Sequence, residues 1–204
     1  MGVSEWALVA VVVLGVLGWA LWVQASRVDR LHRTVLRSRS TLEAQLFRRA
    51  TAATELAGSG VLDPAATLIV TDVALRAIDA VPAGLVRDGL EGGPEADPLG
   101  TEPPSEGEAP VDRALLESEL SRTLRAVLGT REDRAELAQD PRAATVLTQL
   151  EQAWYRLQLA RRFHNAHVEQ VRRVRARGVV RVFHLAGRAP LPEPFDMDDA
   201  RPQD

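Results

Sequence analysis

Residues 6–23, WALVAVVVLGVLGWALWV, constrain the fold of this chain more than any other feature. They contain no charged side chain. As a helix they would span about 27 Å at 1.5 Å per residue, close to the roughly 30 Å thickness of a bilayer's hydrocarbon layer. Trp6 lies at one end, and Trp19 and Trp22 lie near the other, where indole rings favour the headgroup region. We therefore predict a transmembrane helix over 6–23, preceded by a short N-terminal tail, residues 1–5.

A cleaved signal peptide is the competing interpretation, because Val23-Gln24-Ala25 loosely fits a small-residue cleavage site. The first residues, MGVSE, argue against cleavage. They contain no basic residue and include Glu5, whereas signal peptides begin with a basic region.

A series of arginines follows the apolar span and indicates its orientation. They are Arg27, Arg30, Arg33, Arg37 and Arg39. Basic flanks stay on the cytoplasmic side of a membrane. We expect a single-pass protein of the inner (plasma) membrane, with its N-terminus outside and its C-terminal domain in the cytoplasm.

The composition favours an all-α fold, because Ala and Leu are strong helix formers and only 4% of the residues are aromatic. Beyond the span, uninterrupted or periodic segments predict helices over about 24–57, 64–80, 112–128 and 142–177. The span and the first of these should form one continuous helix. In the second, we expect Leu68, Ile69, Leu75 and Ile78 to form the apolar face.

Capping signals support these helix bounds. Asp63-Pro64 and Asp140-Pro141 each place an N-cap residue before a proline at the first helical position. Gly129 should end the third helix, and Thr130 with Asp133 predicts a further short turn of helix after it.

Two segments lack the apolar residues that a packed core needs. Residues 88–110 are rich in acidic residues, Gly and Pro and contain no basic residue, which predicts a disordered acidic linker. The end of the chain, residues 188–204, is similarly acidic and Pro-rich, and we expect it to be a flexible tail. The helical bundle domain would thus cover 24–187.

Short connections predict an antiparallel up-and-down bundle, in which the first and last soluble helices form a long coiled-coil pair. The last helix then returns to the membrane. Its final arginines would join those after the span in a basic collar that contacts anionic lipids. The candidate lipid contacts are Arg27, Arg30, Arg33, Arg172, Arg173, Arg175, Arg177 and Arg181. Segment 179–188, if helical, would lie on the bilayer, with Val179, Val182, Phe183 and Ala186 on one side.

His164 falls in the middle of the apolar stripe of the last long helix, and His167 lies one turn away. A metal site is one interpretation of this pair. It would need further ligands that the sequence does not offer, so we interpret His164 as a hydrogen-bonded core residue and expect no metal and no cofactor. The arginines of 161–188 lack a nucleic-acid recognition motif, and no nucleotide-binding loop or nucleophile motif is present. We therefore expect no enzyme, and nucleic-acid binding is no more than an alternative.

The stretch LQLARRFHNAHV resembles the ARR-(F/Y)-YN-x-x-V signature in the last long helix of the LemA family of bacterial membrane proteins. The span, LEAQLFRRATAATELA, ESELSRTLRAVL and GRAPLPEPFDMDD occur in the same order as in LemA-like proteins of high-GC bacteria. The resemblance covers nearly the whole chain apart from the acidic linker. It implies an antiparallel helical bundle on one membrane span in the bacterial inner membrane, and no known reaction.

The signature maps residue by residue onto this chain. It comprises Arg161, Arg162, Phe163, His164, Asn165 and Val168, and His164 stands where the family has Tyr. The expected function is that of a non-catalytic scaffold or adaptor in membrane organisation, with an anionic membrane, a protein partner or a second copy of the chain as its contacts. The alternative is an anionic-lipid or nucleic-acid-binding module that uses the arginine-rich surface beside the membrane.

Overall fold

The computed structural model describes residues 2–86, 88–90, 112–184, 186–187 and 189–202. Within these ranges the chain forms six α-helices and one 3-10 helix, with no strand. The predicted all-α fold is confirmed. Most of the predicted acidic linker, from residue 91 onward, lies outside the described residues.

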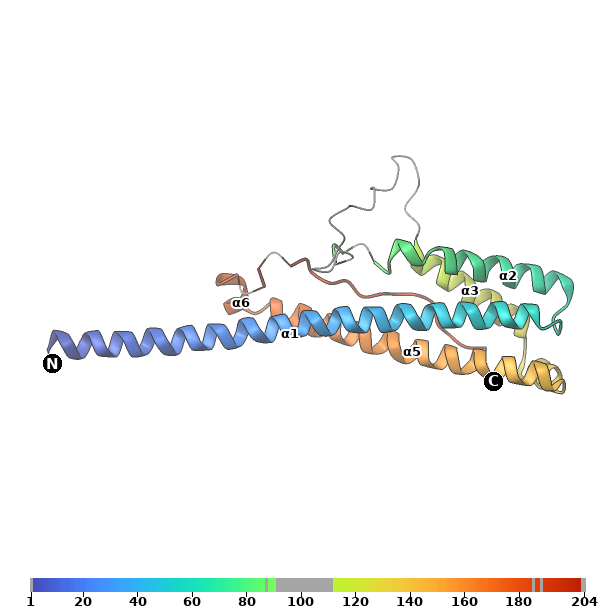
Figure 1. Ribbon diagram of the computed structural model, residues 1–204, viewed down its shortest axis with the longest axis horizontal. Helices are drawn as coiled ribbons and strands as arrows, with labels where there is room; N and C mark the ends of the chain where they lie inside the picture. Colours follow the sequence, from blue (N-terminus) through green and yellow to red (C-terminus); the bar gives the residue numbers. More distant parts are fainter. Residues whose placement is uncertain (1, 87, 91–111, 185, 188, 203–204) are drawn as a thin grey trace, which may run out of the picture.

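Helix α1, Val3–Gly58, is one continuous helix that joins the apolar span to the bundle. It contains a segment long and apolar enough to cross a membrane, and none of that segment is buried within the molecule. The span projects from the bundle as a single rod (Figure 1). The side chains of Leu8, Val11 and Trp19 are each more than three-fifths exposed. An exposed apolar helix of this kind needs an apolar environment, such as a bilayer or a partner helix.

Helix α2, Pro64–Asp79, begins at the predicted N-cap, because Asp63 Oδ1 accepts hydrogen bonds from the backbone N–H groups of Ala65 and Ala66. It is followed by the 3-10 helix η1, Val81–Ala83. Helix α3, Arg113–Leu128, has Asp112 as its N-cap.

Helix α4, Arg131–Leu137, begins with a capping box between Thr130 and Asp133. Gly129, between α3 and α4, has a φ of 56°, and a Cβ there would collide with the Asp133 carboxylate. The connection therefore requires glycine at this position.

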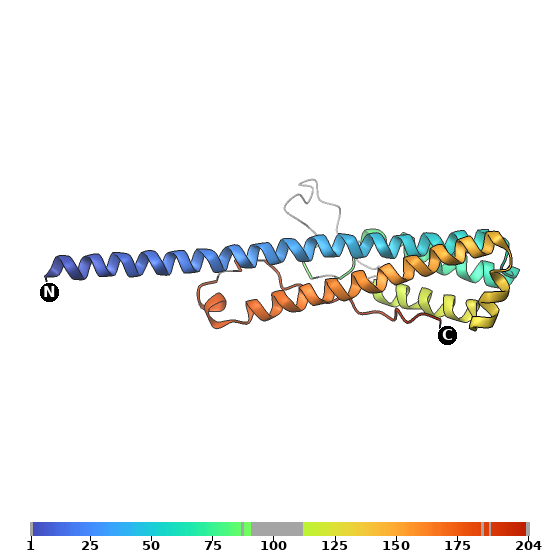
Figure 2. The same ribbon diagram turned by 90° about the horizontal axis from the view of Figure 1, so that it is seen from below.

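Helix α5, Pro141–Arg175, has Asp140 as its N-cap and is the long partner of α1. Helix α6, Gly178–Val182, is shorter than the predicted segment 179–188, and His184 follows it with a φ of 50°. Successive long helices α1, α2, α3 and α5 run in alternating directions, and α2 and α5 lie on different sides of α1 (Figures 1 and 2).

The largest core cluster lies at the end of the bundle far from the span and joins α1, α2, α3 and α5. Trp154 is its largest member and is 1% exposed. Smaller clusters continue along the α1–α5 seam, first Val35 with Val168 and Val171, and then Val28 with Val174 and Val180. These clusters hold the last turns of α5 against α1 immediately beyond the apolar span.

The apolar face predicted for α2 is wrong for three of its four residues, since only Ile78 packs against the core. The helix buries Val70, Val73, Ala74 and Ala77, while Leu68, Ile69 and Leu75 are 72%, 53% and 45% exposed. The physical reason is the partner surface, since α1 presents a row of alanines between residues 50 and 57 to this core. Small side chains on both helices allow a close approach that leucines would prevent.

The expectation of a flexible tail from residue 188 is also corrected for the part that the structure describes. Residues 189–202 are extended and run back along the bundle from α6, antiparallel to α5 (Figures 1 and 2). Phe195 and Met197 are 1% and 7% exposed and belong to a core cluster with Leu42, Leu46 and Leu157. The composition of the tail is that of a disordered segment, but it provides two apolar anchors at alternate positions.

Candidate functional site

The six residues of the family-like signature lie on three sides of α5. His164 and Val168 are completely buried in the seam with α1. Arg161 and Asn165 are partly buried and face the tail. Arg162 and Phe163 are exposed, Phe163 by 61%. The signature therefore combines a core position, a tail contact and a solvent-facing pair.

His164 is a buried, neutral hydrogen-bonding residue. Its Nδ1 lies 3.0 Å from Ser38 Oγ on α1, and its Nε2 is buried with no hydrogen-bond partner in the described part of the chain. Burial, and then the nearby positive charge of Arg39, lower the pKa of His164 to about 4. No group of three or more His, Asp or Glu side chains among the described residues is arranged to hold a metal ion.

Asn165 recognises the backbone of the tail at Phe195. Its Oδ1 accepts a hydrogen bond from the Phe195 N–H, and its Nδ2 donates to the Phe195 carbonyl, both at 3.0 Å. A paired donor and acceptor of this kind fixes an extended strand in one register. Asn165 thereby positions the Phe195 ring over the core cluster.

Arg161 binds the tail through its charge. Its Nε and Nη2 lie 2.8 and 2.9 Å from the two carboxylate oxygens of Asp199, and its Nη1 lies 3.3 Å from Asp196. The bidentate pair with Asp199 is partly shielded from solvent, because the two side chains are 19% and 14% exposed. Planar pairing of this type is the geometry in which Arg and carboxylate interact most strongly.

The end of the tail is held by α3 and by the first half of α5. Arg125 forms a bidentate pair with Asp198, which lowers the pKa of that carboxyl below its usual range. The Asp198 N–H donates to Ser118 Oγ at 3.0 Å. Trp154 Nε1 and Gln158 Nε2 both donate to the Asp199 carbonyl, at 3.0 and 2.7 Å.

A second polar cluster lies inside the bundle and was not predicted from the sequence. Arg49 on α1 donates to the Glu117 carboxylate at 2.7 Å and to Ser121 Oγ at 2.6 Å, and Arg113 donates to the same carboxylate at 3.2 Å. The side chains of Arg49, Arg113 and Glu117 are at most 1% exposed. A sequence signal did exist, since Arg49 continues the seven-residue spacing of Val28, Val35 and Leu42 in the buried seam.

Arg39 and Asp88 form another buried ion pair, with side chains 7% and 0% exposed and 2.6 Å between Arg39 Nη2 and Asp88 Oδ2. Asp88 also accepts a hydrogen bond from the backbone N–H of Glu193 in the tail. Asp88 corrects the sequence interpretation, because it is part of the folded bundle and not of a disordered linker. The charge of Arg39 is paired inside the bundle and is not exposed beside the span.

The candidate lipid-contact arginines gather at one level of the molecule. Val174 and Val180 pack against Val28, so the last turn of α5 and helix α6 lie beside α1 a short distance beyond the apolar span. Arg27, Arg30, Arg33, Arg173, Arg177 and Arg181 are exposed there, and Arg172 and Arg175 are partly exposed. Arg33 pairs with Asp29 on the surface, and Arg175 Nη1 donates to the Pro190 carbonyl at 2.7 Å.

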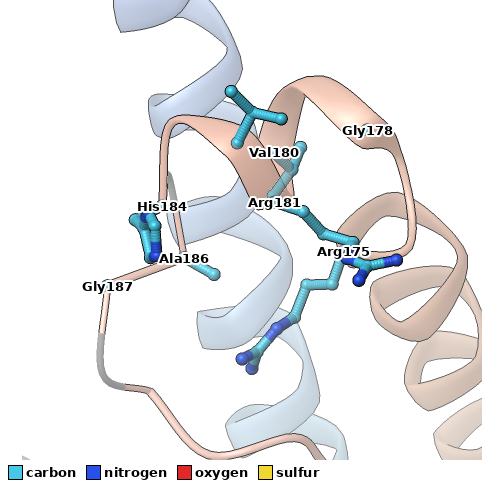
Figure 3. Close-up of a pocket in the computed structure, with 8 residues that line it drawn as sticks. Arg175, Gly178, Val180, Arg181, His184, Ala186 and Gly187 are labelled. Atoms are coloured by element: carbon cyan, nitrogen blue, oxygen red, sulfur yellow. The ribbon is translucent and has the colours of Figure 1, made fainter.

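An open pocket of about 650 Å³ lies at this level. Figure 3 shows Arg175, Arg181 and His184 around it, beside α1. None of the described residues that line it is acidic. On α6 and the residue that follows it, Val179, Val182 and Phe183 are 52%, 71% and 48% exposed, while Val180 is the buried anchor. The arrangement provides cationic side chains next to exposed apolar ones, which suits an anionic interface with an apolar layer beneath it.

No family model, curated protein or solved structure matches this chain.

Proposed function

We propose that this chain is a non-catalytic, single-pass membrane protein with a LemA-like bundle. In this proposal, the bundle is cytoplasmic and acts as a scaffold or adaptor at the bacterial inner membrane. The observation that carries the proposal is the continuity of α1 from the exposed apolar segment into the core of the bundle. A continuous helix transmits position and orientation, so the bundle would stand at a fixed height and angle on the membrane.

The outward face of α2 supports a protein partner. Leu68, Ile69 and Leu75 are large and exposed, whereas the buried positions of the same helix hold Val and Ala. Contiguous exposed apolar side chains are characteristic of interaction surfaces. The proposal therefore assigns partner binding to this face of α2.

The first experiment determines the orientation of the bundle. Because the chain has no cysteine, Thr145→Cys, at an exposed position of α5, provides a single labelling position. A membrane-impermeant maleimide should label it only after the cells are permeabilised. Labelling of intact cells would contradict the cytoplasmic orientation.

The second experiment examines the scaffold role. In mild detergent, the wild-type chain should migrate in a complex larger than its 22.3 kDa monomer in a micelle. In the double variant Leu68→Asp/Leu75→Asp, that complex should dissociate. In Phe47→Asp, at an exposed apolar position of α1, it should remain intact. A wild-type chain that is monomeric in gently solubilised membranes would refute the scaffold.

The second candidate function is anionic-lipid binding by the basic collar, and the exposed Val179, Val182 and Phe183 favour lipid over nucleic acid. The test attaches a bimane probe to Val182→Cys in the reconstituted chain. Its fluorescence emission maximum should shift to shorter wavelength in phosphatidylserine vesicles and not in phosphatidylcholine vesicles. High salt and the double variant Arg177→Glu/Arg181→Glu should both abolish the shift, since the attraction is electrostatic. A shift that is equal in both lipids would eliminate this candidate.

A further inference from the structure

The tail occupies a built binding surface on the bundle. This tail-binding surface consists of Ser118, Arg125, Trp154, Gln158, Arg161 and Asn165. All six contact the tail through side-chain hydrogen bonds or ion pairs. The residues come from α3 and α5, which are separated in sequence by α4 and are held together by the main core.

Much of this recognition is directed at the tail backbone. Asn165 binds both polar groups of Phe195, Trp154 and Gln158 bind the carbonyl of Asp199, and Arg125 binds that of Ala200 at 2.8 Å. A surface that binds an extended backbone in this way recognises the strand, whichever chain supplies it.

Side chains supply the specificity. Phe195 and Met197, at alternate positions, enter the core cluster of Leu42, Leu46 and Leu157. Asp198 and Asp199 follow at once and pair with Arg125 and Arg161. The sequence that fits is an extended strand with two apolar anchors and two carboxylates, and the tail of another copy has this sequence.

Residues 176–183, which lead from α5 toward the tail, make few buried contacts. Only Val180 is buried among them, in a small cluster with Val28 and Val174 against which Leu31 and Ala186 also pack. Fully extended, residues 176–189 would reach roughly 45–50 Å at 3.3–3.6 Å per residue, several times the diameter of a helix at about 10–12 Å. The tail can therefore leave its own bundle, and reach a neighbouring one, without disturbing the main core.

We propose that the tail exchanges between neighbouring copies, so that residues 190–202 of one chain occupy the tail-binding surface of the next. The contacts broken in one copy are remade in the other, so exchange costs little in contact energy, and local concentration decides its extent. This step rests on the proposed function, because an apolar span confines the copies to one plane with tails and binding surfaces at the same height. Exchange would link the anchored bundles laterally.

The test uses two full-length chains with different tags, one carrying Gln158→Cys on the tail-binding surface and the other Arg201→Cys in the tail. Gln158 Oε1 lies 3.0 Å from Arg201 Nε. Gln158→Cys removes one hydrogen bond to the Asp199 carbonyl, but both substitutions leave the apolar anchors Phe195 and Met197 and the ion pairs of Asp198 and Asp199 in place. The chains are coexpressed, extracted in mild detergent and treated with a short bismaleimide. Exchange predicts a cross-linked heterodimer in at least tenfold excess over the control pair Leu68→Cys and Arg201→Cys, because Leu68 lies on the outward face of α2.

Phe195→Asp added to the tail-donating chain should abolish the heterodimer, since the apolar anchor can no longer be seated. The double variant Gln158→Cys/Arg201→Cys in one chain verifies that the two positions cross-link. Exchange is refuted if this double variant reacts internally while the mixed chains give no more heterodimer than the control. It is also refuted if the heterodimer survives Phe195→Asp. The readout in detergent does not depend on membrane orientation, so failure here is separable from failure of the topology experiment.

Discussion

Arg49 and Glu117 form an ion pair in which both side chains are completely buried, with 2.7 Å between Arg49 Nη2 and Glu117 Oε2. The same carboxylate accepts a hydrogen bond from Arg113, so one negative charge serves two arginines. Burial lowers the pKa of Arg49, and the neighbouring Glu117 opposes this change. The pair joins α1 to α3 through the middle of the bundle.

Removal of this carboxylate should destabilise the fold strongly. Glu117→Gln leaves two buried guanidinium groups without a counter-charge, and breaking a buried pair costs about 3–5 kcal/mol. Thermal unfolding of the full chain in detergent, followed by circular dichroism, would measure the loss. The control is Glu119→Gln, whose partner Arg76 is 43% exposed, and it should cost much less stability than Glu117→Gln. Equal effects from both variants would show that burial of Glu117 does not matter.

Stability should depend on pH through His164. Its imidazole stays neutral in the folded chain until about pH 4, whereas an unfolded histidine takes up its proton near 6.5. The unfolded chain therefore binds more protons between these values. The contribution of His164 to stability is complete above pH 6.5 and is lost as the pH falls toward 4.

The groups that face His164 are Ser38, Arg39, Asp88 and His167. His164→Gln should flatten the dependence of the unfolding midpoint on pH between 6.5 and 4.5. An unchanged slope in His164→Gln would contradict a buried neutral imidazole.

Gly129 and Gly58 provide a matched pair of glycine substitutions. At Gly129 the φ of 56° and the overlap with Asp133 predict that Gly129→Ala destabilises the bundle by more than about 1 kcal/mol. At Gly58, the last residue of α1, a Cβ meets no atom within 4 Å, and Gly58→Ala should stabilise the helix by roughly 0.5–1 kcal/mol. Urea unfolding should show that the free energy of unfolding falls in Gly129→Ala and rises in Gly58→Ala. Destabilisation by both substitutions would disprove the distinction.

The tail should become more mobile when the side chain of Asn165 no longer binds the backbone of Phe195. Asn165→Ala deletes both hydrogen bonds to Phe195, worth on the order of 1–2 kcal/mol together. Amide hydrogen exchange at Phe195 should then accelerate about tenfold or more, because 1.4 kcal/mol corresponds to a factor of ten. Phe163→Ala, at an exposed neighbour on the same helix, should leave the exchange unchanged. Persistent protection in Asn165→Ala would show that apolar anchoring alone holds the tail.

The helix starts could be read from the sequence because capping is local. Asp63, Asp112, Thr130 and Asp140 each bind backbone N–H groups two or three residues ahead, so no distant contact is needed. The seam between α1 and α5 was also visible, as valines and leucines at helical spacing on both segments. The resemblance to the LemA family and the orientation in a membrane remain predictions.

The contacts between distant segments could not be read in this way. The outward face of α2 follows from the alanines that α1 presents to it, and the order of the tail follows from Arg161, Asn165 and the pocket for Phe195. The sequence does not reveal that Arg39 pairs with Asp88 and Arg49 with Glu117, while other arginines are exposed to solvent. Local sequence thus determined where α2, α3, α4 and α5 begin, because capping and propensity act over a few residues. Only the tertiary structure decided which faces, charges and tail residues are buried, because burial depends on partners far away in the chain.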